Sequence, residues 1–497
     1  MSQKEEFSNR WGIILAALAM AVGAGNLWRF PRLAGEYGGA FIILWMVFLF
    51  IWSIPILLTE FSIGKKFKRS VIGSYSEFAG SKFAWMGYFI TLCTLGIAFY
   101  YSVVTAWSLQ YLGFSIEYTL KYFQGADLAS IGTQEQLTSY WDNIANGNFK
   151  TVGLHLLALA FAVFVLTKGV KNGLEKANKI LIPTLFILLI VISVIALNID
   201  GGEVGLKYMF GVDAKHFSNP KVWIEALSQS AWSTGAGWGL IMTLSAYSRK
   251  KEDVTLNIIM SSIGNNIASI LAGIAIIPSV FALSASEANA LEYLQSGNQA
   301  LTFTIIPKLF FSIPGGPVLC VIFFGAFFLA AFSSLLPMIE LFIKTLTDLG
   351  IFRKKAVIIA AICCAIFGFP SAWSLDIFNN QDWVWGVGLV VSGLFIIFPA
   401  LRIGVKKIKD EMIDPDSDLR LPDLYYAISM YVNIAFGIVL IWWWLSRGYS
   451  PEPWFTKEGM WNVFDVYSNA SVITQWLVVI ISGLLLNNYI NKKFKTL

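Results

Sequence analysis

The residues best suited to chemistry lie in one stretch near the start of the chain, from Ala19 to Pro31. It continues an apolar run that begins at Trp11, but two glycines, Asn26 and Arg29 interrupt it. Polar side chains and unpaired backbone groups are costly in hydrocarbon and are tolerated where they line a buried or water-filled cavity. Carbonyls freed by unwinding suit a hard cation such as sodium, and freed N–H groups suit a carboxylate. A helix kinked only for packing would need neither Asn26 nor Arg29.

Few other polar side chains interrupt the apolar segments; those suited to a cation are Ser233, Asn265, Ser333 and Ser334. A buried sodium site needs about five or six oxygens, which carbonyl, amide and hydroxyl groups must supply. A lone serine often bonds a carbonyl of its own helix, so each serine alone has a structural explanation. Two asparagines inside the membrane favour coordination instead.

The elements that must position these residues are membrane-spanning helices. The chain has 497 residues, of which 56% are hydrophobic and only 13% are charged, whereas soluble proteins carry about a quarter charged residues. The first apolar run is too long for a cleavable signal. The net charge of +5 is explained by basic cytoplasmic loops and does not indicate nucleic-acid binding. Two histidines, and four cysteines without metal spacing, argue against a haem or a metal enzyme.

Stretches of roughly 20 apolar residues predict about twelve spans. In order, they cover roughly residues 10–36, 39–64, 84–112, 152–168, 177–198, 222–247, 254–283, 304–346, 356–375, 383–402, 424–446 and 470–490. Polar loops are expected at roughly 115–150, up to 220, and at 284–302. Short basic loops alternate with longer, less basic ones, so both termini are expected in the cytoplasm of a multi-pass cell-membrane protein.

Two spans are interrupted by glycines, the first at Gly23 and Gly25 and the sixth at Gly235–Gly239. Interrupted segments at corresponding places in two halves are typical of inverted-repeat transporters with a binding site at the membrane midplane. We therefore expect spans 1–5 and 6–10 to form the two repeats. Residues 1–408 would form the transporter core, and 409–497 would hold spans 11 and 12 and a cytoplasmic tail.

At these residues the chain resembles the neurotransmitter:sodium symporter family, in its branch of bacterial amino-acid transporters. The glycine-rich stretch Ala21–Pro31 is highly specific to that family, and the resemblance covers the first ten spans. Supporting motifs are Ser245-Ala246-Tyr247, Arg353-Lys354-Lys355 and the paired serines of span 8. The resemblance implies an all-α fold with five-plus-five inverted repeats, and sodium-coupled symport of neutral amino acids by alternating access.

The resemblance also implies two sodium sites. The ligands of the first would be the substrate carboxylate, the Ala21 carbonyl and the side chains of Asn26, Ser233 and Asn265. The ligands of the second would be the carbonyls of Ala19, Val22 and Ala330 and the hydroxyls of Ser333 and Ser334.

The substrate class follows from Gly23, which stands where monoamine transporters of the family carry an aspartate. The substrate should therefore bring its own carboxylate, which Tyr101 would bind, and Trp232 would form an aromatic lid. No charged side chain occupies a matching pocket position, so a neutral substrate is implied. Apolar walls suit leucine, isoleucine, valine or methionine, although Trp238 could crowd the pocket toward small substrates. The substrate-binding residues implied are Met20, Ala21, Gly23, Ala24, Gly25, Ile97, Tyr101, Trp232, Ser233, Gly235, Trp238, Ser334 and Met338.

Two gates are implied by the same resemblance. Arg29 and Asp382 match the extracellular pair. On the cytoplasmic side Asp348 matches the gate acid, but Lys4 stands where the family has an arginine and Phe7 where it has a tryptophan. Lysine replaces the planar guanidinium of arginine, which can bond a carboxylate through two N–H groups, with a compact ammonium group, and this weakens such a pair. The supporting members of this gate would be Tyr247 and Glu340.

A bound chloride is a further expectation. Ser269 stands where chloride-independent relatives carry an acidic residue. Donor groups that match a chloride site are those of Gln229, Ser233 and Asn265. Trp45 replaces a tyrosine hydroxyl of that site, and a polar patch filled by water is the alternative.

Other functions stay open at this point. A proton-coupled transporter of the same fold would place a lysine or glutamate at a sodium position, where this chain has amides and hydroxyls. A sodium symporter for small amino acids or other carboxylate-bearing amines would use the same site. A channel would not need paired gates, and an integral membrane enzyme would need a catalytic cluster that the sequence lacks.

Overall fold

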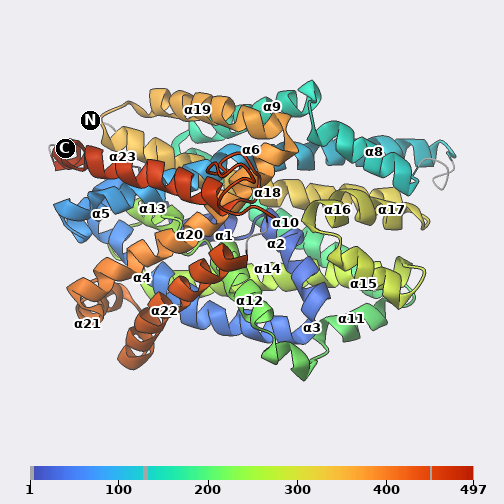
Figure 1. The fold of residues 1–497 in the computed structure, drawn as a ribbon, viewed down its shortest axis with the longest axis horizontal. Coiled ribbons are helices and arrows are strands. Elements are labelled where there is room, and N and C mark those ends of the chain that lie inside the picture. Colours follow the sequence, from blue (N-terminus) through green and yellow to red (C-terminus); the bar gives the residue numbers. More distant parts are fainter. Residues whose placement is uncertain (1–4, 127–131, 448–449, 496–497) are drawn as a thin grey trace.

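The computed structural model describes residues 5–126, 132–447 and 450–495. Its regular structure there is helical, apart from an isolated β-bridge between Phe455 and Trp461. Most long helices run along one common axis, and both described ends of the chain lie at the same end of the bundle (Figure 1).

The helices follow one another in the order below, where η marks 3₁₀- or π-helical turns. The first half contains α1 (Arg10–Ala21), α2 (Ala24–Leu27), α3 (Arg29–Phe48), η1 (Leu49–Ser53), α4 (Ile54–Phe67), α5 (Val71–Phe78), η2 (Ser81–Phe83), α6 (Ala84–Phe123), α8 (Gln134–Ala145), α9 (Phe149–Leu166), η3 (Val170–Glu175), α10 (Lys176–Leu197), α11 (Gly202–Phe210) and η4 (Ala214–Ser218). The second half contains α12 (Pro220–Thr234), α13 (Leu240–Ala246), α14 (Val254–Leu283), α15 (Glu287–Gln295), α16 (Asn298–Ala300), η5 (Leu301–Ile305), α17 (Ile306–Phe311), α18 (Gly316–Asp348), α19 (Arg353–Trp373), α20 (Leu375–Ile403), α21 (Val405–Ile408), η6 (Lys409–Ile413), η7 (Asp414–Asp416), α22 (Asp423–Arg447) and α23 (Asn469–Lys495).

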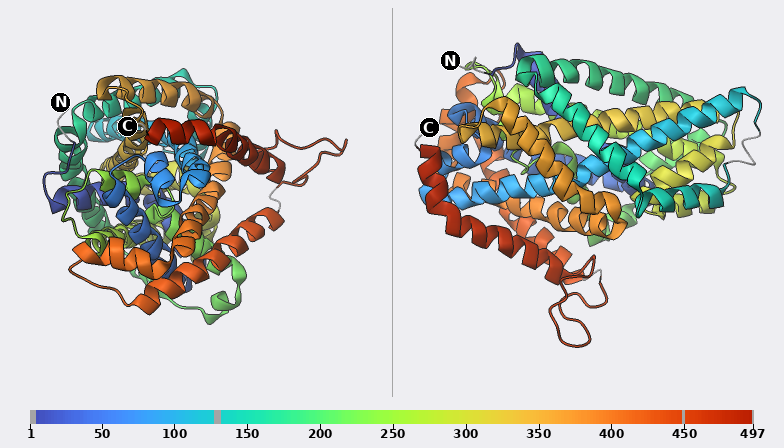
Figure 2. Two further views of the ribbon diagram at one scale, coloured as in Figure 1. Left: turned by 90° about the vertical axis from the view of Figure 1, so that its left-hand side faces the viewer. Right: turned by 90° about the horizontal axis from the view of Figure 1, so that it is seen from above.

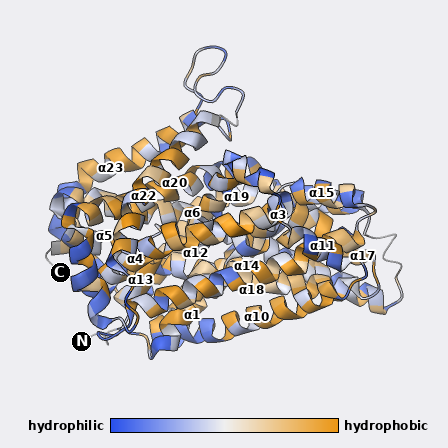
Figure 3. Cartoon of the chain, turned by 90° about the horizontal axis from the view of Figure 1, so that it is seen from below, coloured by the Kyte–Doolittle hydropathy of each residue, from blue (hydrophilic) through white to orange (hydrophobic). Residues whose placement is uncertain are grey.

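The described helices account for the twelve expected spans. Ten helical segments are long and apolar enough to cross a membrane, the first of them covering Arg29–Phe67. The other two spans are the interrupted ones, α1 with α2 and α12 with α13, whose pieces are shorter. Figure 3 shows hydrophobic residues along the outside of the bundle and hydrophilic ones concentrated toward its two ends, as a membrane-embedded bundle requires.

Three expected boundaries were wrong. Span 10 begins at Leu375 and not near 383. Span 8 begins at Gly316 and not near 304, because Pro314 and Gly315 end the apolar run and Gly315 takes a left-handed φ of 76°. The residues before it form η5 and α17, a separate helical segment outside the span. The expected polar loop at 115–150 is also shorter, because α6 continues to Phe123 and α8 forms within it.

The interrupted helices lie inside a scaffold of long ones. α6 packs along α18, while α10 and α14 flank the bundle beside them. α1 packs against α14, α18 and α10, so its broken end lies among the longest helices. α22 and α23 lie at the edge of the bundle, and the loop between them projects sideways (Figure 2).

Candidate functional site

The first span breaks where its sequence stops supporting a helix. α1 ends at Ala21, and Val22 and Gly23 take extended backbone conformations. The Asn26 side-chain oxygen accepts a hydrogen bond of 2.9 Å from the amide of Gly23, which satisfies one backbone group freed by the break. The break therefore leaves the carbonyls on its α1 side available at mid-span depth.

The sixth span breaks at three glycines, each with a positive φ that other residues rarely adopt. Gly235, Gly237 and Gly239 have φ values of 73°, 91° and 73°. The buried carboxylate of Glu60 accepts hydrogen bonds from Gly237 (2.9 Å) and Gly239 (2.7 Å). Glu60 was not among the residues expected from sequence to serve the site, although an acid inside an apolar span was a usable signal.

Oxygen atoms converge between the two breaks. One amide atom of Asn265 lies 3.0 Å from the carbonyl oxygens of both Ala21 and Ser233. The Asn26 amide nitrogen lies 2.8 Å from the same Asn265 atom, and the Ser233 hydroxyl lies 3.1 Å from the other one. These buried side chains and carbonyls are the set expected for the first cation, and they are close enough for one ion to contact several.

A second group of oxygens joins α1 to α18. The single proton of the Ser334 hydroxyl is shared between the carbonyls of Ala19 (2.8 Å) and Val22 (3.2 Å). Ser333 donates to the carbonyl of Ala330 at 3.1 Å. The structure thus joins Ser334 of α18 to Ala19 and Val22 of α1, while Ser333 bonds to Ala330 within α18. All five residues expected at the second cation are buried.

A cavity of about 230 Å³ lies beside both oxygen groups. Ten of the thirteen residues expected to bind substrate line it, and the exceptions are Ala24, Ile97 and Gly235. The amide of Ala24 nevertheless donates to the Tyr101 hydroxyl at 2.9 Å, and Gly235 adjoins Met20. A Cβ at Gly23 would lie 2.6 Å from the Tyr101 hydroxyl, whereas a Cβ at Gly25 would meet no atom within 4 Å. Gly23 therefore has no room for a side chain.

Comparison with known proteins identifies this arrangement. The model of the sodium:neurotransmitter symporter family matches residues 4–131 and 134–371. The chain belongs to this family. It is therefore a sodium-dependent transporter and not an enzyme.

Individual proteins similar to this transporter support the family assignment. A sodium-dependent transporter of Methanocaldococcus jannaschii is 31% identical over 360 residues, which cover 72% of each chain. The sodium-dependent neutral amino acid transporter B(0)AT2 of Pongo abelii is 27% identical over 310 residues, 58% of this chain and 42% of that protein. The crystal structure of MhsT in complex with L-phenylalanine matches with a TM-score of 0.76 and 27% identity, and covers 88% of this chain and 99% of that one. The five-plus-five fold expected from sequence is confirmed by this match.

The residues expected to form the extracellular gate line the same cavity. Arg29 and Asp382 both line it, but the ion pair of Arg29 among the described residues is with Glu225, at 3.2 Å. Ser228 accepts a further hydrogen bond from Arg29 at 2.8 Å. The expected Arg29–Asp382 pair is not formed in this conformation, and Glu225 was missed because nothing in its spacing links it to Arg29.

Glu340, expected to support the cytoplasmic gate, belongs to a buried ion pair. Tyr247 donates to Glu340 at 2.7 Å, and Arg353 donates two hydrogen bonds of 2.8 Å to the same carboxylate. Asp348 is bonded to Lys344 (2.6 Å) and to the backbone amide of Ser70. Its expected partner Lys4 lies outside the described residues. Arg353 was missed as the partner of Glu340, although its motif was recognised.

Of the residues expected to hold chloride, Ser233, Asn265 and Ser269 lie at the oxygen group expected to bind the first cation, and Gln229 lines the cavity beside it. Ser269 accepts a hydrogen bond of 2.7 Å from Asn26. Gln229 is 1% exposed, and both its amide atoms lack a protein partner. The indole N–H of Trp45 is also buried without one. Unpaired buried donors are costly, so these two side chains have unmet capacity for a ligand or water.

Proposed function

We propose that this transporter carries neutral, apolar amino acids together with sodium, by alternating access across the cell membrane. One observation carries the proposal: the crowded surroundings of Gly23 exclude an acidic side chain there, between Tyr101 and Ser334. A substrate must then supply its own carboxylate to the cation group and to Tyr101. The names of B(0)AT2 and of the MhsT complex with L-phenylalanine support this class.

Two sodium ions would act at the two oxygen groups. The first ion would be held by Ala21, Asn26, Ser233 and Asn265, and would also contact the substrate carboxylate. A ligand shared by ion and substrate makes the affinity of each depend on the other, which is how coupling arises. The second ion, between α1 and α18, would join a piece of the broken helix to the scaffold. Removing it would free α1 to move.

The substrate side chain would lie against aromatic and thioether groups. Trp232 and Trp238 meet edge to face, with ring centroids 5.4 Å apart. Both line the cavity, together with Met20 and Met338. These two tryptophans and two methionines cannot neutralise a charge, so a charged substrate side chain lying against them would have no partner there. The charged residues that line the cavity are Arg29, Arg32, Glu225 and Asp382.

A binding screen tests the proposal. The twenty amino acids would be tested against the purified transporter in sodium and in potassium buffers. We expect leucine, isoleucine, valine, methionine or phenylalanine to bind only in sodium, and aspartate and lysine not to bind in either buffer. Preference for glycine or alanine would instead identify Trp238 as a barrier to larger side chains. Equal binding in potassium would contradict sodium coupling.

Membrane orientation is part of the proposal. The basic loops after the even-numbered spans support a cytoplasmic location for both termini. Both described chain ends lie at the same end of the bundle (Figure 2), and the Glu340–Arg353 pair lies at that end because Arg353 also pairs with Glu5 at 3.7 Å. The cavity would then open outward in this conformation.

A further inference from the structure

α1 is a separate helix of 12 residues, and its helical conformation ends at Val22. This break can act as a hinge, because Val22 and Gly23 are extended and the backbone amides on either side bond within their own segment, Val22 to Leu18 and Asn26 to Gly23. If access alternates as proposed above, the cytoplasmic end of α1 must be held in one conformation and released in the other. The contacts that hold it now show what such a device consists of.

One side of this end is fixed by a buried acid at the end of η3, directly before α10. The Glu175 side chain is 1% exposed and accepts hydrogen bonds from the backbone amide (2.8 Å) and hydroxyl of Ser8. Lys179 pairs with the same carboxylate at 2.6 Å. α1 approaches so closely here that a Cβ at Gly12 would lie 2.6 Å from Glu175. Glycine at this position therefore permits the contact.

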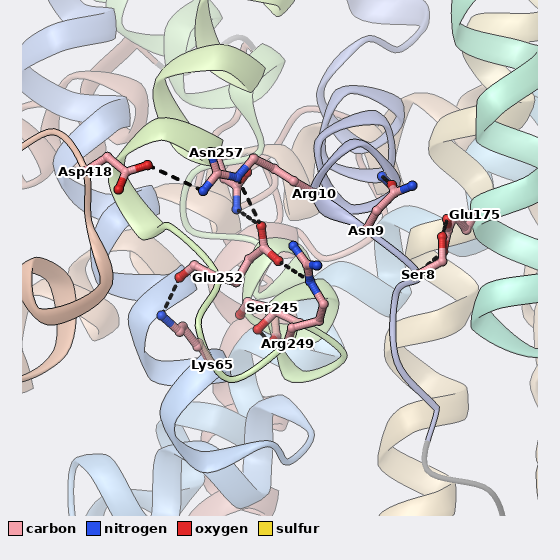
Figure 4. A network of polar contacts seen from close by, with 12 residues as sticks. Ser8, Asn9, Arg10, Lys65, Glu175, Ser245, Arg249, Glu252, Asn257 and Asp418 are labelled. Atoms are coloured by element: carbon pink, nitrogen blue, oxygen red, sulfur yellow. Dashed lines mark hydrogen bonds and ion pairs between the residues drawn. The ribbon is translucent and has the colours of Figure 1, made fainter.

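The opposite side is fixed by a second buried acid, Glu252, in the loop before α14 (Figure 4). Its side chain is also 1% exposed and lies 3.7 Å from the guanidinium of Arg10. Arg249 (3.0 Å) and Asn257 (3.3 Å) are its other side-chain partners. Arg10 reaches further to Asp418, at 3.5 Å.

Asp418 belongs to the loop between spans 10 and 11, and this loop is attached to the scaffold. Its backbone amide donates to Asp253 at 2.7 Å, and its neighbour Asp416 pairs with Lys65 of α4 at 2.8 Å. Lys65 also donates to the backbone carbonyl of Glu252. Arg10 therefore connects a hinged helix to groups that are held independently of it.

We propose that Ser8–Glu175 and Arg10–Glu252–Asp418 form a two-sided latch on the cytoplasmic end of α1, with the two glutamates as its positioning residues. The latch rests on the proposed alternating access, and it is distinct from the expected Lys4–Asp348 pair. The latch can open reversibly because each glutamate has other partners in the scaffold. When α1 leaves, Glu175 keeps Lys179, and Glu252 keeps Arg249 and Asn257, so neither buried acid is left unpaired.

The cost of opening is correspondingly small. The Arg10 side chain is 38% exposed and that of Asp418 is 76% exposed, so water replaces much of what their pairing contributes. Loss of Arg10 should therefore shift the conformational balance and not unfold the protein.

Spin labels can measure that shift directly. Labels at Glu6→Cys and Lys407→Cys would report the distance between the end of α1 and the scaffold, in lipid nanodiscs with and without sodium. We expect Arg10→Gln to raise the ratio of the long-distance to the short-distance population roughly two- to fivefold. Asp418→Asn should shift it in the same direction by less, because Glu252 still holds Arg10. Arg10→Lys should restore most of the short-distance population.

Glu411→Gln is the matched control, since it removes an exposed charge from the same cytoplasmic loop and no ion pair to α1 involves it among the described residues. An unchanged distribution in Arg10→Gln, or an equal shift in Glu411→Gln, would overturn the latch. Sodium-dependent uptake of a neutral, apolar amino acid by the unlabelled wild type is measured in parallel. Absence of uptake would count against the proposed function, whereas the distances would still decide on the latch.

Discussion

The hydroxyl of Tyr101 accepts a hydrogen bond of 2.9 Å from the amide of Ala24. This contact orients the phenol at the break of span 1, where a Cβ on Gly23 would collide with it. The hydroxyl keeps its own proton to donate, and the cavity beside it is where a substrate carboxylate would lie. One residue thus joins the broken backbone to the proposed substrate group.

Tyr101→Phe should weaken amino-acid binding by about ten- to a hundredfold, since a hydrogen bond to a charged group contributes about 1.5–3 kcal/mol. Sodium binding without substrate should change much less, because Tyr101 is not among the proposed sodium ligands. Isothermal titration with the best substrate from the screen measures the first affinity, and titration with sodium alone measures the second. Tyr118→Phe, on the same helix but away from the cavity, is the control. Equal losses in the two variants would contradict the assigned contact.

Asn265→Ala should weaken sodium and substrate binding together. The variant removes an amide that lies between the carbonyls of Ala21 and Ser233, so the sodium ion loses one oxygen ligand. Because the substrate carboxylate would contact the same ion, weaker sodium binding also weakens substrate binding. A shift of the sodium half-saturation by about tenfold corresponds to only about 1.4 kcal/mol. Sodium titrations of substrate binding measure it. Sodium-independent, undiminished uptake by the variant would refute this site.

Glu60→Gln should destabilise the break of span 6. The carboxylate accepts from two backbone amides, whereas a glutamine would turn an NH₂ group toward one of them. A buried donor left without an acceptor costs about 1–3 kcal/mol. The melting temperature in detergent should fall, and substrate affinity should fall with it, while the exposed Glu203→Gln on α11 should change neither. A Glu60→Gln protein with unchanged melting temperature and affinity would contradict the role.

The breaks and the oxygen groups were predictable because their signals are local. Glycines, asparagines and paired serines in apolar segments violate the rules for membrane helices, and each violation marks a place where the structure needs special backbone or ligands. Asn26, Ser333 and Ser334 lie where that reasoning placed them relative to the breaks.

The partners of charged residues were harder to predict. Glu225 and Glu60 bond to groups far along the chain, and no spacing in one sequence links them. The predicted start of span 8 was wrong for a related reason. The apolar run through Phe311 looks like membrane helix, and only the turn at Pro314–Gly315 separates it from α18.

Chloride is the final prediction, and its motive is electrostatic. Two cations near mid-membrane are costly, and a zwitterionic substrate adds no net charge to offset them. Ser269, where chloride-independent relatives carry an acid, bonds to the proposed sodium ligand Asn26. The unpaired amide of Gln229 and indole of Trp45 are donors that an anion could use.

Substrate affinity should therefore fall about tenfold or more when sodium gluconate replaces sodium chloride, a change of about 1.4 kcal/mol. Ser269→Glu should restore affinity in gluconate, because its carboxylate would supply the missing negative charge beside Asn26. Ser279→Glu, on the same helix but outside the ion sites, should not restore it. Equal affinity of the wild type in both salts would mean that the donors bind water and that the transporter works without chloride.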